Sequence, residues 1–467
     1  TAGNFLIIAC FLAISFVPTD KTIVTIDDKA SGIAATATTI ANINESAIIL
    51  ADYGKIYILR ILKGDVKMRG NIVVGQSGGP TAVINSSVAG VYAAAKKLGV
   101  KKIYGMVHGI QGFLQDNLID LGEYLDDETG IELLKRTPSA FLGSCRFKMP
   151  KIEGHEEVYE KVFEIMEKHD IECLFYAGGN DSMDTVKMLS DYAAAHNKPQ
   201  RFMGVPKTID NDLPVTDHCP GYGSAAKYIA TSMKEIIRDN ESFGVEKPTV
   251  CIVEIMGRHA GWLTAAAALS RGDDCTGPDA IYLPEVTFDM DKFMEKVKHL
   301  AATKSSVVIA VSEGIALADG RFVCELGNAS DFVDAFGHKQ LSGCAATLAN
   351  KVAAETGLKT RAVEFSTLQR AATHLASLTD INEAFQVGHD AVVAAEEGKT
   401  GMMITLDRNG EDPYQCGTSA YDIHAIANVE RPVPAEWITE DGCDVNEGYE
   451  KYARPLIMGE LQPLFIN

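Results

Sequence analysis

Short apolar runs alternate with longer amphipathic stretches along the chain from residue 72 onward. The apolar runs predict β-strands at Ile72–Gly75, Ile103–Val107, Cys173–Tyr176, Phe202–Val205, Val250–Ile255, Ala280–Leu283, Val307–Val311, Ala362–Phe365 and Met402–Leu406. The amphipathic stretches predict helices at Val83–Leu98, Val186–His196, Ala225–Arg238, Met290–Thr303, Leu341–Glu355 and Ile381–Glu397. This alternation is typical of an α/β fold with mostly parallel sheets covered by helices on both faces.

The number of predicted strands exceeds the usual size of one sheet. The sequence therefore predicts two doubly wound, mostly parallel-sheet lobes with the active site in the cleft between them. One lobe is expected to contain residues 68–217 and 370–420, and the other residues 218–369 and the C-terminal segment. The sequence has no long flexible linker, so we expect the lobes to exchange chain.

The first 67 residues differ from the rest of the chain. Phe5–Val17 is an apolar run, but its 13 residues are too few for a comfortable transmembrane helix, and no basic residue precedes it as in a signal peptide. Residues 19–67 have no sustained period, whereas a strong strand follows Met68. We expect the working protein to begin near Met68, with residues 1–67 a foreign or mis-called extension. The alternative is a secreted or membrane-tethered enzyme.

Composition and charge narrow the class of protein. The chain has 467 residues, of which 46% are hydrophobic and 23% charged, a soluble globular composition. Its formal net charge of −20 argues against a nucleic-acid-binding protein but permits a phosphorylated small substrate in a locally basic cleft. The ten cysteines form no CxxC pair, which indicates reduced thiols in a cytoplasmic protein rather than a disulfide framework. No association with a membrane is expected.

Polar clusters lie at or near the ends of the predicted strands. They are Gly75–Ala82, Gly143–Phe147, Ala177–Ser182, Pro206–Asp212, Met256–Trp262, Val311–Gly314, and the pairs Thr360–Arg361 and Gln369–Arg370. Each cluster alone is also compatible with an ordinary turn or helix start. Open α/β sheets bind their ligands in crevices at the carboxyl ends of strands, so the joint placement predicts a binding site.

The segment Pro206–Asp212 contains a lysine, a threonine and two aspartates within seven residues. Asp210 is placed to accept a proton from an attacking hydroxyl, and Lys207 to balance charge on an anionic group in transfer. A polar turn with an internal ion pair is the alternative interpretation. In Ala177–Ser182, short polar side chains after two glycines suit either a metal-bound phosphate or an N-capped helix.

Together these motifs resemble the phosphofructokinase family, and most closely its pyrophosphate-dependent branch, over about 400 residues from Met68. The resemblance implies that Gly78 and Gly79 bind the donor phosphates, that Arg146 contacts the transferring phosphoryl group, and that Asp210 deprotonates the 1-hydroxyl of fructose 6-phosphate. It further implies a sugar-phosphate site formed by Thr208, Ile209, Asp210, Met256, Gly257, Arg258, Glu313, Arg361, Thr367 and Arg370.

Two positions indicate which donor is used. ATP-using members of the family read GGDGS and GTIDND, whereas this chain has Asp181 and Lys207 at the variable places. A carboxylate at 181 disfavours the α-phosphate of ATP, and a lysine at 207 adds charge for pyrophosphate. The resemblance also implies Mg²⁺ as cofactor, with Asn180 and Asp212 as its protein ligands.

Three residues depart from the family pattern. Asn180 stands where a metal-linked aspartate is common, so its direct ligation of Mg²⁺ is left open. Thr367 replaces a histidine near the sugar phosphate, and Thr249 replaces an arginine that reaches the neighbouring subunit in ATP-dependent tetramers. A homo-oligomer, with a dimer favoured, is therefore an expectation from the family alone.

Other functions remain open at the level of the sequence. An ATP-dependent enzyme requires Asp181 to tolerate a nucleotide. A non-catalytic regulatory subunit is supported by Asn180, but such a subunit has no need to retain Lys207, Asp210 and Arg146. A dinucleotide-binding dehydrogenase is disfavoured because the chain lacks the GxGxxG turn and its acidic ribose contact.

Overall fold

The chain divides into two compact units, residues 1–67 and 68–467. The computed structural model describes residues 23–28, 33–38, 45–52, 55–62, 68, 70–243, 247–327 and 341–459. The first unit contains two antiparallel strand pairs, β1 (Ile23–Asp28) with β2 (Ile33–Thr38) and β3 (Glu45–Asp52) with β4 (Lys55–Leu62). The apolar run Phe5–Val17 lies outside the described residues, and the expectation that residues 1–67 are foreign stays a prediction.

The second unit contains a seven-stranded sheet whose five central strands are parallel. Two antiparallel edge strands, β15 and β7, complete it. The strand order is β15 (Tyr414–Asp422), β14 (Met402–Glu411), β9 (Arg201–Pro206), β8 (Ile171–Gly178), β5 (Asn71–Gln76), β6 (Ile103–Met106) and β7 (Leu118–Asp120). The central strands are buried on both faces, which explains their nearly continuous apolar sequences.

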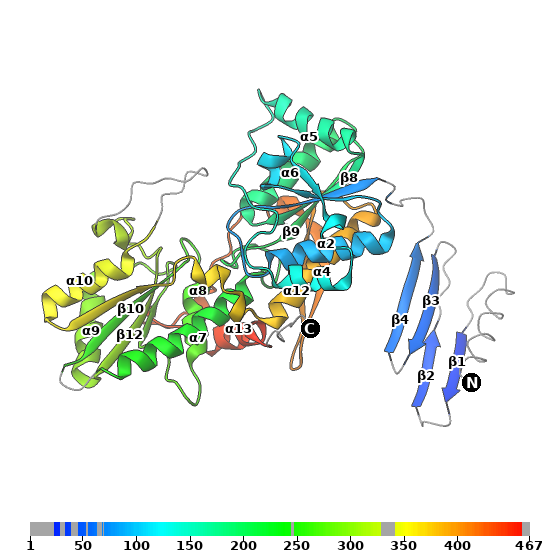
Figure 1. The fold of residues 1–467 in the computed structure, drawn as a ribbon. Helices are drawn as coiled ribbons and strands as arrows, with labels where there is room; N and C mark the ends of the chain where they lie inside the picture. Colours follow the sequence, from blue (N-terminus) through cyan, green and yellow to red (C-terminus); the bar gives the residue numbers. More distant parts are fainter. Residues whose placement is uncertain are drawn as a thin grey trace. The chain divides into compact units, whose positions relative to one another are not determined.

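Helices cover both faces of this sheet because neighbouring strand residues point to opposite sides. On β5, Ile72 and Val74 pack with α2 (Ile84–Leu98) and α12 (Leu378–Glu396), whereas Val73 faces the other layer. That other layer contains α5 (Glu156–Lys168) and α6 (Asn180–Ala195), and Figure 1 shows the two layers on either side of the strands. The shorter helices of this lobe are α3 (Gly109–Phe113) and α4 (Glu128–Arg136).

A second, smaller sheet has four parallel strands. Their order is β11 (Ala280–Tyr282), β12 (Ser306–Ser312), β10 (Thr249–Ile255) and β13 (Lys359–Glu364). Its helices are α7 (Tyr222–Glu241), α8 (Trp262–Ala265), α9 (Met290–Thr303), α10 (Cys344–Thr356), α11 (Leu368–Ala371) and α13 (Glu447–Ala453). On β10, Val250 and Ile252 pack against the helices on one face of the sheet. Cys251 and Val253 pack against the helices on the other face.

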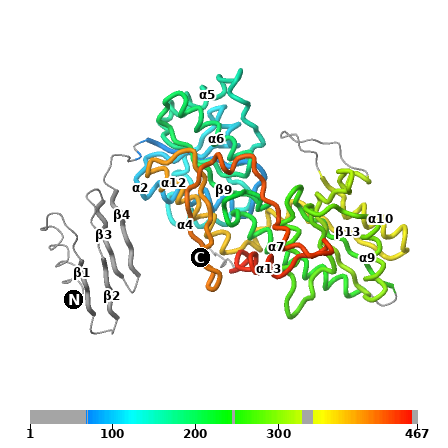
Figure 2. The backbone as a smooth tube through the Cα atoms, turned by 180° about the vertical axis from the view of Figure 1, so that it is seen from behind, coloured from blue at the N-terminus to red at the C-terminus, as the bar shows by residue number. Residues whose placement is uncertain are grey.

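The chain passes repeatedly between the two sheets. It returns to the larger sheet through α12, β14 and β15, and the later helix α13 then packs beside α7 in the smaller lobe (Figure 2). The hydroxyl groups of Tyr222 and Tyr449 join these two helices at 2.6 Å. The prediction of a two-lobed, mostly parallel α/β fold is confirmed, while the residue boundaries proposed for the lobes stay a prediction.

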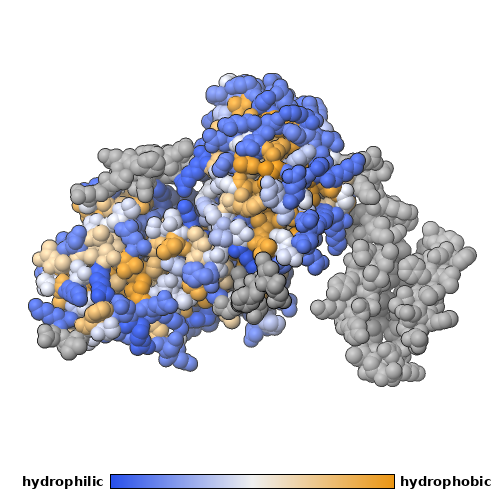
Figure 3. All heavy atoms as spheres, viewed as in Figure 1, coloured by the Kyte–Doolittle hydropathy of each residue, from blue (hydrophilic) through white to orange (hydrophobic). Residues whose placement is uncertain are grey.

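The predicted elements agree with the observed ones, and the edge strand β15 is one that the sequence pattern missed. All nine predicted strands and all six predicted helices are present, with ends shifted by a few residues. The edge strand β15 was missed because its residues are half-buried or exposed and form no apolar run. Polar side chains also cover much of the larger lobe around α5 in Figure 3, in keeping with the acidic sequence of that helix. Within the described residues, no helix is long and apolar enough to cross a membrane.

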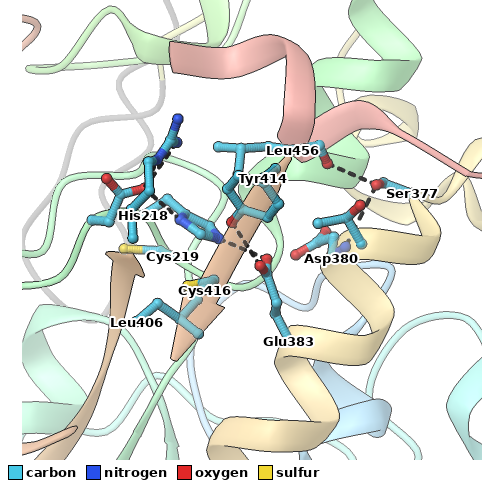
Figure 4. A network of polar contacts seen from close by, with 12 residues as sticks. His218, Cys219, Ser377, Asp380, Glu383, Leu406, Tyr414, Cys416 and Leu456 are labelled. Atoms are coloured by element: carbon cyan, nitrogen blue, oxygen red, sulfur yellow. Dashed lines mark hydrogen bonds and ion pairs between the residues drawn. The ribbon is translucent and has the colours of Figure 1, made fainter. Parts of the chain in front are cut away.

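A buried polar cluster ties α12 and the β14–β15 hairpin to the segment that precedes α7. His218 lies between two carboxylates, with Nδ1 2.8 Å from Oδ1 of Asp217 and Nε2 2.7 Å from Oε2 of Glu383. The hydroxyl of Tyr414 donates to Oε1 of Glu383, as Figure 4 shows, and Arg408 donates to Asp217. Two cations and two anions thus neutralise one another around the fully buried ring of His218.

The charge state of His218 gives this cluster a pH dependence. Burial alone would lower the pKa of His218 from its ordinary value of 6.5, but Glu383 and Asp217 outweigh it and raise the pKa to about 9. A raised folded-state pKa stabilises the protein fully below the unfolded pKa, and this contribution is lost as the pH rises through about 9.

We expect His218→Gln to remove this pH-dependent contribution. The unmodified chain should have a higher free energy of unfolding than the variant at pH 6.5, and this difference should shrink by roughly 3 kcal/mol above pH 9. Urea denaturation of both proteins at both pH values measures the difference. His424→Gln, which alters an exposed histidine that also contacts two carboxylates, is the control. An unchanged gap for His218→Gln would contradict the assignment.

Candidate active site

The loops after five strands meet around one cavity of about 330 Å³ between the two sheets. The loops follow β5, β8 and β9 of the larger sheet and β10 and β12 of the smaller one. The lining consists of polar and glycine-rich residues: Ser77, Gly78, Gly79, Pro80, Arg146, Gly179, Asn180, Asp181, Ser182, Lys207, Thr208, Ile209, Asp210, Asp212, Met256, Arg258, His259, Ala260, Glu313, Arg370 and Glu430. Segments more than 200 residues apart therefore form one site.

Lys207 follows directly on β9 and is the most deeply buried cation of the cavity. Only 3% of its surface is exposed, and its Nζ donates to the carbonyl oxygen of Gly79 at 2.8 Å. Burial lowers the pKa of Lys207 to about 8, opposed by Asp210 and assisted by Arg370 and Arg146. A phosphate group in the cavity would stabilise the ammonium form, so this lysine is suited to bind an anion.

The glycine-rich loop after β5 is held in place by its neighbours. Gly78 has a φ of +74°, a conformation that glycine adopts without strain. Its N–H donates to the carbonyl of Cys145 at 3.1 Å, and its own carbonyl accepts the Ser144 hydroxyl at 2.6 Å. A Cβ atom on Gly79 would lie 2.9 Å from Nη1 of Arg370, so this guanidinium lies directly against the loop.

Two carboxylates follow Lys207 in the same loop. Burial raises the pKa of Asp210, although Lys207 and the Thr208 hydroxyl oppose the shift. Burial and the charge of Asp210 raise the pKa of Asp212 to about 7. A carboxylate with a raised pKa is a better proton acceptor, and a cation placed beside the pair would favour their ionised forms.

The start of α6 follows β8, the strand between β5 and β9, and lies beside the loops that carry Gly79 and Lys207. Asn180 and Asp181 open this helix, so free backbone N–H groups and the positive end of the helix dipole face the cavity. Nδ2 of Asn180 donates to the carbonyl of Val429 at 3.0 Å, while its Oδ1 is buried and accepts no hydrogen bond. An orphaned amide oxygen at this place fits a cation ligand.

The wall from the smaller sheet consists of the loops after β10 and β12. Gly257 has a φ of +144°, and a Cβ there would lie 2.6 Å from the carbonyl of Ala260, so the turn requires glycine. The Ser312 hydroxyl donates to the carbonyl of Gly257, while the Gly257 N–H lies 3.4 Å from Oε1 of Glu313. Burial raises the pKa of Glu313 to about 7.

The structure brings most of the predicted site residues to this cavity. Those that line it are Gly78, Gly79, Arg146, Asn180, Asp181, Lys207, Thr208, Ile209, Asp210, Asp212, Met256, Arg258, Glu313 and Arg370. Gly257 lies behind the lining and shapes the turn. Their roles in binding and catalysis stay predictions.

Two predicted residues lie elsewhere in the chain. Nη1 of Arg361 donates to Asp239 at 2.8 Å, and its guanidinium lies 4.3 Å from the ring centre of Phe243. Arg361 lines a separate cavity of about 430 Å³ between α7 and β13, and Thr367 is exposed outside the central cavity. Within one chain, neither side chain reaches Lys207 and Asp210.

Sequence reasoning missed one part of the site. Glu430 lines the cavity, and its charge adds to burial in raising the pKa of Asp210, and to burial and the charge of Asp210 in raising the pKa of Asp212. It comes from the segment after β15, more than 200 residues after Asp210 and Asp212. Its surroundings, Asn428-Val429-Glu430-Arg431, contain no glycine turn or apolar run that would mark a site.

Paired parallel sheets, a glycine-rich loop before a helix and a buried lysine beside carboxylates are typical of α/β proteins that transfer phosphoryl groups. The phosphofructokinase family model matches residues 71–395, and the chain belongs to this family. The resemblance seen in the sequence is thereby confirmed.

Named relatives and solved structures agree with this membership. The chain is 41% identical over 399 residues to the pyrophosphate–fructose 6-phosphate 1-phosphotransferase of Halomonas elongata, covering 85% of this chain and 94% of that protein. The Xanthomonas campestris protein of the same name is also 41% identical, with 84% and 92% covered. The crystal structure of the pyrophosphate-dependent phosphofructokinase from Nitrosospira multiformis matches with a TM-score of 0.76 and 38% identity, covering 85% and 94%.

We expect Lys207→Met to weaken the binding of inorganic pyrophosphate by about 10- to 100-fold, because a hydrogen bond to a charged group contributes about 1.5–3 kcal/mol. Methionine keeps the volume of the side chain but carries no charge. Isothermal titration calorimetry measures the affinity, and Lys198→Met, which alters a more exposed lysine paired with Glu167, is the control. Equal affinities for the two variants would contradict the role of Lys207.

Proposed function

We propose that this protein transfers a phosphoryl group from pyrophosphate to the 1-hydroxyl of fructose 6-phosphate, giving fructose 1,6-bisphosphate and phosphate. The observation that carries the proposal is the contact of the buried Lys207 with the glycine loop at Gly79, in the cavity that Asp181 in the first turn of α6 also lines. The lysine supplies a fixed positive charge at the donor loop. The named relatives act on the same substrates.

The chain's own residues perform the reaction by positioning and charge neutralisation. Asp210 accepts the proton of the 1-hydroxyl as the oxygen attacks the terminal phosphorus of pyrophosphate. Lys207 and Arg146 neutralise the charge that spreads over the transferring phosphoryl group. Phosphate leaves, and the proton on Asp210 returns to solvent. In the reverse direction Asp210 donates that proton.

Arg258, Glu313 and Met256 are proposed to hold fructose 6-phosphate on the side of the smaller sheet. The Glu313 carboxylate suits sugar hydroxyls, and the guanidinium of Arg258 suits a phosphate. Arg370 lies against Gly79 and is therefore within reach of the donor loop as well as the acceptor side. This placement suits a residue that aligns the two substrates.

Mg²⁺ is the proposed cofactor, with the buried Oδ1 of Asn180 and the carboxylate of Asp212 as its protein ligands. Mg²⁺ would neutralise charge on the phosphate oxygens. Among the described residues, no three His, Cys, Asp or Glu side chains form a group that could hold a metal ion. The protein therefore supplies few ligands, and most of the coordination would come from pyrophosphate and water.

An ATP-dependent enzyme and a non-catalytic subunit are the competing functions. ATP requires room and neutral surroundings for its α-phosphate, and the carboxylate of Asp181 opposes both. A non-catalytic subunit gains nothing from burying Lys207 beside carboxylates, which costs desolvation energy. We further propose that the protein is cytoplasmic, which the free cysteines throughout the described residues support. We also propose a homo-oligomer, which the location of Arg361 away from the cavity of its own chain supports.

We expect Asp210→Ser to lower kcat by about 10²- to 10⁴-fold, because loss of a positioned general base has this effect. The Michaelis constants should change little, since the carboxylate acts mainly in the transition state. Asp191→Ser, which alters an exposed aspartate on α6, serves as the control in the same coupled assay. A near-normal kcat for Asp210→Ser would refute its role as base.

The double variant Asp181→Gly, Lys207→Gly tests donor choice. Removing both side chains takes away the repulsion of a nucleotide and the charge that binds pyrophosphate. We expect pyrophosphate-dependent activity to be nearly abolished and a low ATP-dependent activity to appear. Loss of both activities in a folded variant would support the role of Lys207 in using pyrophosphate. It would contradict the role of Asp181 in opposing a nucleotide.

A further inference from the structure

The segment Asn428–Val433, here called the strap, runs from the end of the larger lobe to the smaller lobe along one side of the cavity. Nδ2 of Asn428 donates to Asp184 of α6 at 2.8 Å. At the other end, the N–H of Val433 donates to Oε1 of Glu285 at 2.9 Å, and the same oxygen accepts the N–H of Gly261. The strap thus contacts the donor wall and the turn that follows Arg258.

Arg431 makes most of the contacts between the strap and the loop that carries Asp210 and Asp212. Its N–H donates to the carbonyl of Asp212 at 2.7 Å. Its guanidinium donates to three more backbone carbonyls of the same loop: Asn211 at 2.9 Å, Thr216 at 2.7 Å and Asp217 at 2.8 Å. The side chain therefore fixes the path of the loop on both sides of Asp212.

The same residue is fixed from the smaller lobe. Its guanidinium lies 4.8 Å from the ring centre of Trp262, and Nε1 of Trp262 donates to its carbonyl at 2.9 Å. Trp262 begins α8, directly after the turn that carries Arg258. Arg431 thus joins the loop of the predicted base to the turn of the predicted sugar-phosphate site.

We propose that Arg431 is a positioning residue for phosphoryl transfer, which sets the placement of Asp210 relative to the acceptor side through the strap. The inference rests on the proposed function. A displacement of about 1 Å in a catalytic group can cost about 10²-fold in rate. Lysine cannot replace arginine here, because one ammonium group cannot follow the planar fork that reaches three carbonyls.

The first test compares Arg431→Lys with the unmodified chain. We expect kcat to fall by about 10²-fold with little change in either Michaelis constant. Arg271→Lys is the matched control, because Arg271 fixes a later part of the same C-terminal segment through Asp444 and Glu450 and makes no contact with the Asp210–Asp217 loop. Its kcat should stay unchanged even if its melting temperature falls. Equal kcat values for Arg431→Lys and the unmodified chain, or a rise in KM alone, would overturn the proposal.

A second test uses Arg431→Ala, which leaves space for a free guanidinium ion. Millimolar guanidinium should restore part of the lost kcat in this variant, whereas methylammonium should not. A purely structural role predicts recovery of the melting temperature without this selectivity. Equal rescue by both ions, or no rescue, in a folded variant would overturn the proposal.

Hydrogen exchange separates this proposal from the proposed function. In Arg431→Lys, the amides of residues 211–219 should exchange faster than in the unmodified chain, whereas Arg271→Lys should leave them unchanged. If the unmodified chain does not turn over pyrophosphate and fructose 6-phosphate, the proposed function fails and Arg431 has no reaction to position. If the chain is active but the exchange of residues 211–219 is the same in all three proteins, the positioning role alone fails.

Discussion

The hydrogen bond from the buried ammonium group of Lys207 to the carbonyl of Gly79 is the contact on which the site depends. It joins the end of β9 to the glycine loop after β5, so the donor loop and the predicted base share one anchor. Burial of this cation is unfavourable in the free protein and lowers its pKa to about 8. An anionic donor would stabilise the buried ammonium group and so offset this unfavourable burial. That attraction would contribute to the binding of the donor.

The rest of the molecule holds the loops around this cation in register. The strands supply rigid ends, but the loop from Asp210 to Asp217 has little regular structure and depends on distant partners. Arg431 fixes its carbonyls from the strap, and His218 fixes its far end against Glu383 of α12. Both contacts are polar and at least partly buried, so a lost partner would leave an unsatisfied group, at a cost of about 1–3 kcal/mol. The geometry of the site is therefore coupled to the stability of the C-terminal part of the chain.

Features that depend on residues close together in the chain could be predicted from the sequence. The buried strand Phe202–Val205 and the charged loop after it are neighbours in the chain, so the site at this strand end followed from pattern alone. Glu430 and Arg431 were missed because only tertiary packing brings them beside Asp212. The edge strand β15 was missed because half-exposed residues give no apolar run. Arg361 is the reverse case, a predicted site residue that lies elsewhere. Its motif matched the family, but within the chain it pairs with Asp239 outside the cavity.

The central claim is that this site uses pyrophosphate because Lys207 supplies the charge and Asp181 opposes a nucleotide. The most direct measurement is the initial rate of fructose 1,6-bisphosphate formation by the purified chain, with Mg²⁺ and fructose 6-phosphate and either pyrophosphate or ATP as donor. The account predicts rapid turnover with pyrophosphate and little or none with ATP. Turnover with ATP and none with pyrophosphate would contradict it.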